Sequence, residues 1–480
     1  MTASQVPRPV PLLSSDVALA GAEPVGKLVA TALAAMAQGI VTRGGPLPAG
    51  GPDAVRAAIA AIEPLPTRGI GAEAAIAELS GVLAAGSADP ADPWCAAHLH
   101  CPPLAVSAAA DLVASVLNPS MDSWDQAPAA SALEGAFTAR LARLCYPRAT
   151  APDALITSGG TESNLTALLL AREALGPDVV AVCGRNSHHS IARAGWLLGL
   201  PEPVPVATVA DRIDPAALAE VLRGLRRPAV VVATAGTTNT GAIDPLGAVA
   251  DLAAESGSWL HVDAAYGGAL LFSDQRRALL DGLDRADTIA LDLHKLGWQP
   301  IAAGVLACRE ASTVDNLATR ADYLNADDDT EAGLPDLLGR SLRTSRRPDA
   351  FKMAVTARAL GVRGIGELVD RCCETAMQVA RAVDGHPRLR LWAHPTLSTV
   401  LLRPSIADEV GGAEGDALVA AVRRGLLDEG TAVLGRATLA PVDGGGDRLW
   451  LKLTLLHPHA TLADYLPLLD LVADRAARCC

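Results

Sequence analysis

The sequence of 480 residues is poor in aromatic side chains and carries little positive charge. Phe, Trp and Tyr together make up 3% of the chain, which argues against a stacking platform for unpaired bases. The formal net charge is −13 and no basic stripe is visible, so we expect no nucleic-acid partner. The nine cysteines show no C-x-x-C spacing, which predicts neither a zinc site nor a disulfide framework and favours a reduced, cytoplasmic setting.

Long apolar runs are missing as well. The first residues, MTASQVPRPVPLLSSD, lack the basic stretch followed by an apolar stretch that marks a secretory signal. No uninterrupted apolar run reaches about 18 residues, so we expect no membrane span and no membrane partner. The chain is nevertheless 50% hydrophobic, which is enough for a large core and more than one structural unit.

The order of the apolar and amphipathic segments predicts an α/β fold. Between about residues 150 and 310, short unbroken apolar runs such as DALIT, VVAVCG, AVVVATAG and DTIALD alternate with amphipathic stretches such as ESNLTALLLAREALG and QRRALLDGLDRA. This alternation is typical of a mostly parallel sheet covered by helices on both faces. We expect three parts: a helical segment over 1–100, a large domain over 101–350, and a smaller α+β domain over 351–480.

Several polar side chains follow these predicted strands directly. Lys295, one of four lysines, comes just after a buried strand, where a free ammonium is costly. The turn over 158–161 has small residues that open a helix and could bind a phosphate, although an ordinary helix cap would look the same. Asp263, His188 and Thr234 also stand at strand ends, where a cap, an ion pair or a turn would explain each one separately.

One ligand would explain all these side chains together, because the carboxyl ends of parallel strands meet at one edge of the sheet. That ligand is pyridoxal 5'-phosphate. It has an aldehyde that condenses with a lysine such as Lys295, and a ring nitrogen that an acid such as Asp263 keeps protonated. Its phosphate matches the glycine turn, and its flat ring matches a stacked imidazole, which we assign to His188. The sequence therefore predicts a pyridoxal-phosphate site and no metal.

Longer stretches of the sequence resemble a known family. They include NPSMDSWDQAPAASALE, TSGGTESNLTALLLAR, TAGTTNTGAIDPL, HVDAAYGG, ADTIALDLHKLGWQPIAAGVL, ADYLN and SLRTSRRPDAFK, in the family's order over about residues 118–365. The chain resembles the group II pyridoxal-phosphate-dependent amino acid decarboxylases, and most of all the branch that acts on L-2,4-diaminobutyrate, lysine or ornithine. The resemblance implies the fold type I (aspartate-aminotransferase-like) architecture, with a seven-stranded, mostly parallel sheet.

The resemblance also implies roles for individual residues. Lys295 is implied to bind the cofactor covalently, Asp263 to face the ring nitrogen, and His188 to stack on the ring. Tyr323 matches a tyrosine on a mobile loop that returns a proton to the α-carbon. The implied cofactor contacts are Gly160, Thr161, His188, Thr234, Asp263, Ala265, Asp292, His294 and Lys295. The implied substrate-side residues are His98, His100, Cys101 and Arg346.

The family further implies a homodimer in which residues 120–126 cross to the partner and the first hundred residues pack on it. Gly297, Ala354 and His100 depart from the branch pattern, which leaves the identity of the amino acid substrate open. Two alternatives to simple decarboxylation also remain. One is a decarboxylation-dependent oxidative deaminase or another fold type I reaction. The other is a protein of the same fold that serves as a non-catalytic scaffold.

Overall fold

The computed structural model describes residues 19–318, 324, 327–335 and 337–479. By internal contacts the chain divides into two units, one comprising Met1–Asp89 with Gly425–Val433, and the other comprising Pro90–Arg424 with Leu434–Cys480.

Three helices make up most of the first unit: α1 (Ala22–Arg43), α2 (Gly51–Ala60) and α3 (Ala72–Gly86), with α1 and α3 packed along each other. Among the described residues, α1 alone is long and apolar enough to cross a membrane by length and composition, and it is mostly exposed. The sequence expectation differed because it counted unbroken apolar runs, which Lys27, Thr31 and Gln38 interrupt. Core helices of soluble proteins pass the same test, so α1 alone does not define a membrane span.

A seven-stranded sheet forms the centre of the second unit, in the order β2-β10-β9-β8-β7-β3-β4. Its strands are β2 (Asp153–Thr157), β3 (Val180–Gly184), β4 (Val204–Val206), β7 (Ala229–Thr234), β8 (Trp259–Asp263), β9 (Thr288–Asp292) and β10 (Gly304–Cys308). Strands β4, β3, β7, β8 and β9 pair in parallel, and β10 runs antiparallel to both β9 and β2. The prediction of a mostly parallel seven-stranded sheet is confirmed.

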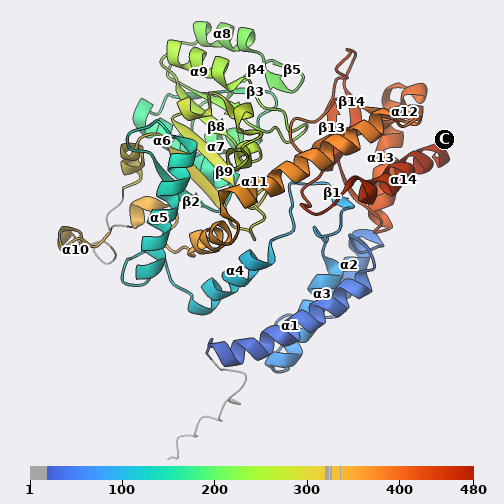
Figure 1. The fold of residues 1–480 in the computed structure, drawn as a ribbon, viewed down its shortest axis with the longest axis horizontal. Helices are drawn as coiled ribbons and strands as arrows, with labels where there is room; N and C mark the ends of the chain where they lie inside the picture. Colours follow the sequence, from blue (N-terminus) through green and yellow to red (C-terminus); the bar gives the residue numbers. More distant parts are fainter. Residues whose placement is uncertain (1–18, 319–323, 325–326, 336, 480) are drawn as a thin grey trace, which may run out of the picture. The chain divides into compact units, whose positions relative to one another are not determined.

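Helices cover both faces of this sheet (Figure 1). One face carries α6 (Gly160–Leu175) and α7 (Ser190–Leu197), and the other carries α5 (Pro128–Cys145), α8 (Pro215–Gly224) and α9 (Leu246–Glu255). Alternate residues of β3 serve the two cores, with Ala181 and Cys183 facing α6 and α7, and Val180 and Val182 facing the opposite side. Both faces are therefore apolar, as the unbroken strand sequences predict.

One expected helix is absent from the described structure. Residues 275–286 contain two short 3₁₀ segments, η2 (Arg277–Leu280) and η3 (Leu283–Arg285), and follow a third, η1 (Gly267–Phe272). Gly282 interrupts the turn with φ of 96°, and a Cβ there would lie 2.6 Å from the backbone nitrogen of Gly247. This close approach fixes a left-handed residue inside the amphipathic pattern and prevents a continuous α-helix.

The remaining connections are short elements. They are α4 (Ala105–Leu117), the hairpin β5 (Thr208–Val209) and β6 (Arg212–Ile213), η4 (Ala311–Leu317), α10 (Asp327–Glu331) and η5 (Leu338–Arg340). The long helix α11 (Asp349–Asp384) follows and is kinked at Gly361, whose φ is 69° and ψ is 171°.

A five-stranded sheet completes the second unit, in the order β1-β13-β14-β12-β11. Its strands are β1 (Cys95–Ala96), β13 (Val433–Leu439), β14 (Arg448–Thr454), β12 (Thr399–Pro404) and β11 (Leu389–Leu391), accompanied by α12 (Ser405–Val410), α13 (Gly412–Asp428) and α14 (Leu462–Arg478). The sequence pattern anticipated strands at β11, β12 and β14 but missed β1 and β13.

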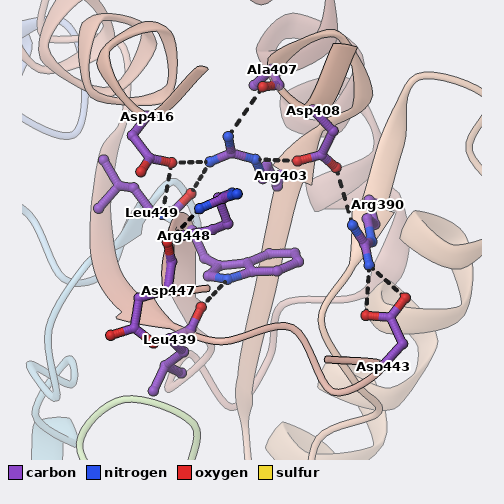
Figure 2. Close-up of polar contacts among 11 residues, drawn as sticks. Arg390, Arg403, Ala407, Asp408, Asp416, Leu439, Asp443, Asp447, Arg448 and Leu449 are labelled. Atoms are coloured by element: carbon purple, nitrogen blue, oxygen red, sulfur yellow. Dashed lines mark hydrogen bonds and ion pairs between the residues drawn. The ribbon is translucent and has the colours of Figure 1, made fainter. Parts of the chain in front are cut away.

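Buried Arg403 ties this sheet to the helices that follow β12 (Figure 2). Its Nε lies 2.6 Å from Asp408 Oδ1, and its Nη1 lies 2.7 Å from Asp416 Oδ1. Nη1 also donates to the carbonyl oxygen of Leu449 at 2.6 Å. A guanidinium with no exposed side-chain surface needs such partners, because an unpaired buried charge is strongly unfavourable.

Candidate active site

A cavity of about 440 Å³ opens where the strands of the large sheet end. Strands β2, β3, β7, β8 and β9 all present their carboxyl ends to this edge, because β10 is antiparallel to both of its neighbours. The lining residues are Leu99, Ser158, Gly159, Gly160, Thr161, Asn164, His188, Thr234, Gly236, Thr238, Asp263, Ala265, Tyr266, Asp292, His294, Lys295 and Ile301. The nine residues that the family resemblance implies as cofactor contacts all line this cavity.

Lys295 lies in the turn that follows β9, beside a buried carboxylate. Its Nζ is 3.5 Å from Asp292 Oδ2, and its side chain is 19% exposed. The other oxygen of Asp292, Oδ1, lies 2.7 Å from Nδ1 of His294. The ion pair explains how an amine can stand at a strand end, and partial exposure leaves the amine open to the cavity.

The glycine turn before α6 approaches the same carboxylate. Gly160 N–H donates to Asp292 Oδ2 at 3.2 Å. A Cβ on Gly160 would lie 2.9 Å from Cβ of Ala265, and one on Gly159 would lie 2.9 Å from Cε1 of His294. Small residues are therefore required here, and they place the positive end of the α6 dipole at the cavity wall, where an anion is favoured.

Asp263 ends β8 with both carboxylate oxygens engaged. Oδ1 accepts from the backbone N–H of Ala265 at 3.1 Å, and Oδ2 accepts from Nδ2 of Asn164 at 2.8 Å. Hydrogen bonds of this kind stabilise the charged form of a carboxylate. The side chain is buried and still lines the cavity, so it can face a protonated ring nitrogen.

His188 lies in the turn between β3 and α7, half-buried, on the cavity wall. Its Nδ1 is 2.8 Å from Oγ of Ser190. Burial lowers the pKa of His188, and the nearby charge of Asp263 opposes this effect only in part. The imidazole is therefore neutral near pH 7.

Thr234 gives an independent sign that a polar ligand belongs in the cavity. Among the described residues, its Oγ1 is buried yet has no hydrogen-bond partner. An unpaired buried hydroxyl is unfavourable, so it marks a place where a ligand is expected to bind. This hydroxyl, the glycine turn, Asp263 and Lys295 together fit a ligand with a phosphate, a ring nitrogen and an aldehyde.

The residues predicted on the substrate side are not all at the cavity. Leu99 lines it, whereas His98 and His100 are exposed and do not. Cys101 is buried, with its Sγ 3.1 Å from the carbonyl oxygen of His294, and burial raises the pKa of its thiol to about 12. Cys101 therefore supports the turn beside Lys295 as an unreactive thiol.

Arg346 is buried away from the cavity lining, against α5. Its Nη1 donates to Oε2 of Glu134 at 2.8 Å, and its Nη2 lies 2.7 Å from Oε1. Its carbonyl oxygen accepts from Met121 N–H at 3.0 Å, which connects it to the segment over 120–126. The substrate contact assigned to Arg346 stays a prediction.

Three further positions were singled out in the sequence. Tyr323 lies outside the described residues, so its role in protonation stays a prediction. Gly297 stands where the related branch has an aromatic residue, and a Cβ there would lie 2.5 Å from the carbonyl oxygen of Leu293. This backbone has no room for a side chain at Gly297. Ala354 is buried within α11.

Sequence reasoning missed three buried polar residues at the cavity: Asn164, which lines it, and Ser190 and His261, which do not. Asn164 lies in the motif TSGGTESN, three positions after Thr161, and His261 opens HVDAAYGG, two positions before Asp263. A polar side chain on the inward face of a buried strand or helix is the signal that could have revealed them.

The fold and the site together define the class of this protein. The model of the pyridoxal-dependent decarboxylase conserved domain matches residues 71–404, so the chain belongs to that family and is a pyridoxal-phosphate-dependent amino acid decarboxylase, a carboxy-lyase. It is 41% identical over 433 residues to "L-2,4-diaminobutyrate decarboxylase" of Rhizobium meliloti (strain 1021), covering 88% of this chain and 86% of the relative. It is 34% identical over 420 residues to the protein of the same name from Acinetobacter baumannii, covering 80% of each.

Solved structures agree with this assignment. The glutamate decarboxylase domain of diaminobutyrate-pyruvate transaminase and L-2,4-diaminobutyrate decarboxylase from Vibrio parahaemolyticus superposes with a TM-score of 0.82 at 31% identity, covering 95% of this chain and 96% of that one. The fold is also shared with Oryza sativa TDC, solved with PLP and tryptamine, at a TM-score of 0.85 and 23% identity, covering 96% of this chain and 99% of that chain. The predicted family, fold type, activity class and cofactor are confirmed.

Proposed function

We propose that this enzyme decarboxylates L-2,4-diaminobutyrate and releases carbon dioxide and 1,3-diaminopropane. The observation that carries the proposal is the 41% identity, over 88% of this chain, to a relative named for that reaction. Lysine and ornithine, which differ in chain length, are the nearest competitors.

The charges of the cavity support a cationic rather than an acidic substrate. Among the described residues that line it, the acidic and basic side chains other than histidine are Lys295, Asp263 and Asp292, and no arginine is present. A second carboxylate on the substrate would lack the guanidinium fork that usually binds one. A second amine would meet a field to which two aspartates contribute.

Bound pyridoxal phosphate would supply an aldehyde for covalent attachment and a ring that takes up the electron pair left by carbon dioxide. Lys295 Nζ would anchor the cofactor, and the α6 N-terminus with Gly160 and Thr161 would bind its phosphate. Asp263 would hold a proton at the ring nitrogen, which strengthens the ring as an electron acceptor. His188 would lie over the ring and orient it.

Proton return to the α-carbon is assigned to Tyr323. A Tyr323→Phe variant should keep its cofactor and lose most of the rate at which amine is formed. Analysis of the product with and without oxygen separates a decarboxylase from an oxidative deaminase, because only the latter consumes oxygen and yields an aldehyde. An unchanged amine rate in the variant would remove Tyr323 from the reaction.

We also propose a cytoplasmic homodimer whose active sites lie at the interface. Support comes from an apolar groove of about 250 Å³ formed by α4 and the start of α5, which includes Gln126 of the segment expected to cross to the partner. In the first unit, Leu33, Val41 and Leu83 expose more than half of their surface. Contiguous exposed apolar surface marks protein–protein or membrane contacts. A monomer in analytical ultracentrifugation would contradict the homodimer. Recovery of the protein in the membrane fraction of cells would contradict the cytoplasmic location.

A panel of L-amino acids assayed for carbon dioxide release tests the proposed substrate. The panel comprises 2,4-diaminobutyrate, ornithine, lysine, aspartate and an aromatic amino acid, each with the product amine identified. The highest kcat/KM is expected for 2,4-diaminobutyrate. A higher value for aspartate, or no release from any member, would overturn the proposal. If protein saturated with pyridoxal phosphate releases no carbon dioxide from any amino acid, a non-catalytic scaffold is favoured.

A further inference from the structure

A chain of mostly buried hydrogen bonds runs from β8 and β9 to His188 on the cavity wall. Trp259 Nε1 lies 3.3 Å from Thr288 Oγ1, which lies 2.9 Å from His261 Nδ1. His261 Nε2 lies 2.9 Å from Asn164 Oδ1. The amide nitrogen of Asn164 reaches Ser190 Oγ at 2.8 Å as well as Asp263 Oδ2 at 2.8 Å.

The two ends of this chain fix the direction of every hydrogen bond in it. An indole N–H can only donate, so Thr288 Oγ1 accepts from Trp259 and is free to donate to His261 Nδ1. An ionised carboxylate can only accept, so the NH₂ group of Asn164 must face Asp263, and its carbonyl oxygen must face His261. His261 therefore carries its proton on Nε2, the tautomer that Thr288 also requires. Donors and acceptors match at each step.

Matching donors to acceptors in the same way fixes the tautomer of His188, which lies on the cavity wall. Ser190 Oγ already accepts from Asn164, so its own hydrogen is available to Nδ1 of His188, 2.8 Å away. The backbone N–H of Ser190 points to the same nitrogen at 3.3 Å. With two donors aimed at it, Nδ1 is unprotonated, and the single proton of neutral His188 is on Nε2.

We propose that Asn164 is a positioning residue which, through one amide group, donates a hydrogen bond to the carboxylate of Asp263 and holds His188 as the Nε2–H tautomer. Neither task requires Asn164 to touch the substrate. Its side chain is almost fully buried, and its NH₂ and carbonyl groups are all engaged, so no other orientation of the amide satisfies its neighbours. The inference rests on the proposed function, because it assumes that the cofactor ring lies between Asp263 and His188.

The test compares two variants of the loaded enzyme by nitrogen-15 NMR, with label in histidine and in the ring of added pyridoxal phosphate. Asn164→Ala removes the hydrogen bond to Asp263 and the one to Ser190, which leads on to His188. Ser190→Ala removes only the connection to His188. The His188 signals are assigned by their loss in His188→Gln. Thr166→Val, on the same helix, serves as the control because the Thr166 hydroxyl bonds only the carbonyl oxygen of Glu162.

In Asn164→Ala we expect two changes. The His188 signals move toward a mixture of tautomers, and the ring-nitrogen signal moves toward unprotonated pyridine, because a carboxylate that has lost a donor competes better for the ring's proton. In Ser190→Ala only the His188 signals move, and in Thr166→Val neither moves. The cofactor dissociation constant should rise about tenfold in Asn164→Ala, the size expected for a lost hydrogen bond to a charged group.

Unchanged His188 and ring-nitrogen signals in Asn164→Ala would overturn the inference. A ring-nitrogen shift of equal size in Ser190→Ala would also overturn it, since that pattern indicates general loosening. Both outcomes leave the proposed function intact if the parent enzyme still releases carbon dioxide from 2,4-diaminobutyrate. Failure of the parent to bind the cofactor would instead refute the proposed function.

Discussion

We expect that breaking the ion pair between Arg346 and Glu134 destabilises the second unit strongly. The side chains are 1% and 8% exposed, and two short contacts of 2.7 and 2.8 Å join them. Removing one partner leaves the other charge buried, which costs about 3–5 kcal/mol. Glu134→Gln keeps the shape and one acceptor, so we expect a loss of about 3 kcal/mol in the free energy of unfolding.

Urea unfolding followed by tryptophan fluorescence measures this loss, with Arg346→Met and the double variant Glu134→Leu/Arg346→Met completing a cycle. Because a buried pair can often be replaced by apolar residues at little cost, the double variant should lie within about 1–2 kcal/mol of the parent. The assay also bears on the predicted substrate contact. If Glu134→Gln is as stable as the parent and Arg346→Met chiefly raises KM, the reasoning is refuted and Arg346 serves the substrate.

Four other changes test the site. Lys295→Ala should abolish covalent cofactor binding and nearly all carbon dioxide release, as absorbance and gas evolution would show; release at the parent rate would rule out this lysine. Thr234→Val should weaken cofactor binding in a titration while stabilising the cofactor-free protein by up to about 1 kcal/mol, because it removes an unpaired buried hydroxyl; a destabilised apoprotein would mean that the hydroxyl has a partner. Gly297→Phe should unfold at lower denaturant, because a Cβ would lie 2.5 Å from the carbonyl oxygen of Leu293; unchanged stability would show that the turn yields. Burial lowers the pKa of His261 to about 4, below the ordinary 6.5, so the folded protein binds fewer protons than the unfolded chain between these values. Its contribution to stability is complete above pH 6.5 and falls by about 1.4 kcal/mol for each pH unit from there down to about pH 4, below which it no longer changes; His261→Asn should flatten this slope, and an equally steep profile would exclude His261 as its source.

The large sheet and its ligand edge follow from the sequence because their signals are local. The runs around Val231 and Ile289 are apolar on both faces, which only a covered parallel sheet accommodates. Lys295 and Asp263 stand directly after such runs, and strand direction brings them to one edge. Tertiary contacts were not needed to place them.

Features that depend on contacts distant in the sequence were not predictable in this way. The interruption at Gly282 comes from backbone that lies against Gly247, and the burial of Arg346 comes from Glu134 on another helix. The hydrogen-bond chain through Asn164 joins residues from four separate segments. A periodic pattern reports which face is buried, but it does not report what that face meets.

Reduction of the loaded enzyme with borohydride, followed by peptide mapping, tests the central claim most directly. Borohydride converts the bond between a lysine and the cofactor aldehyde into a stable amine, so the modified peptide identifies the lysine. We predict a single phosphopyridoxyl group on Lys295, in the peptide containing LDLHKLGWQP. Absence of the adduct, or an adduct on Lys352 or Lys452, would contradict the account.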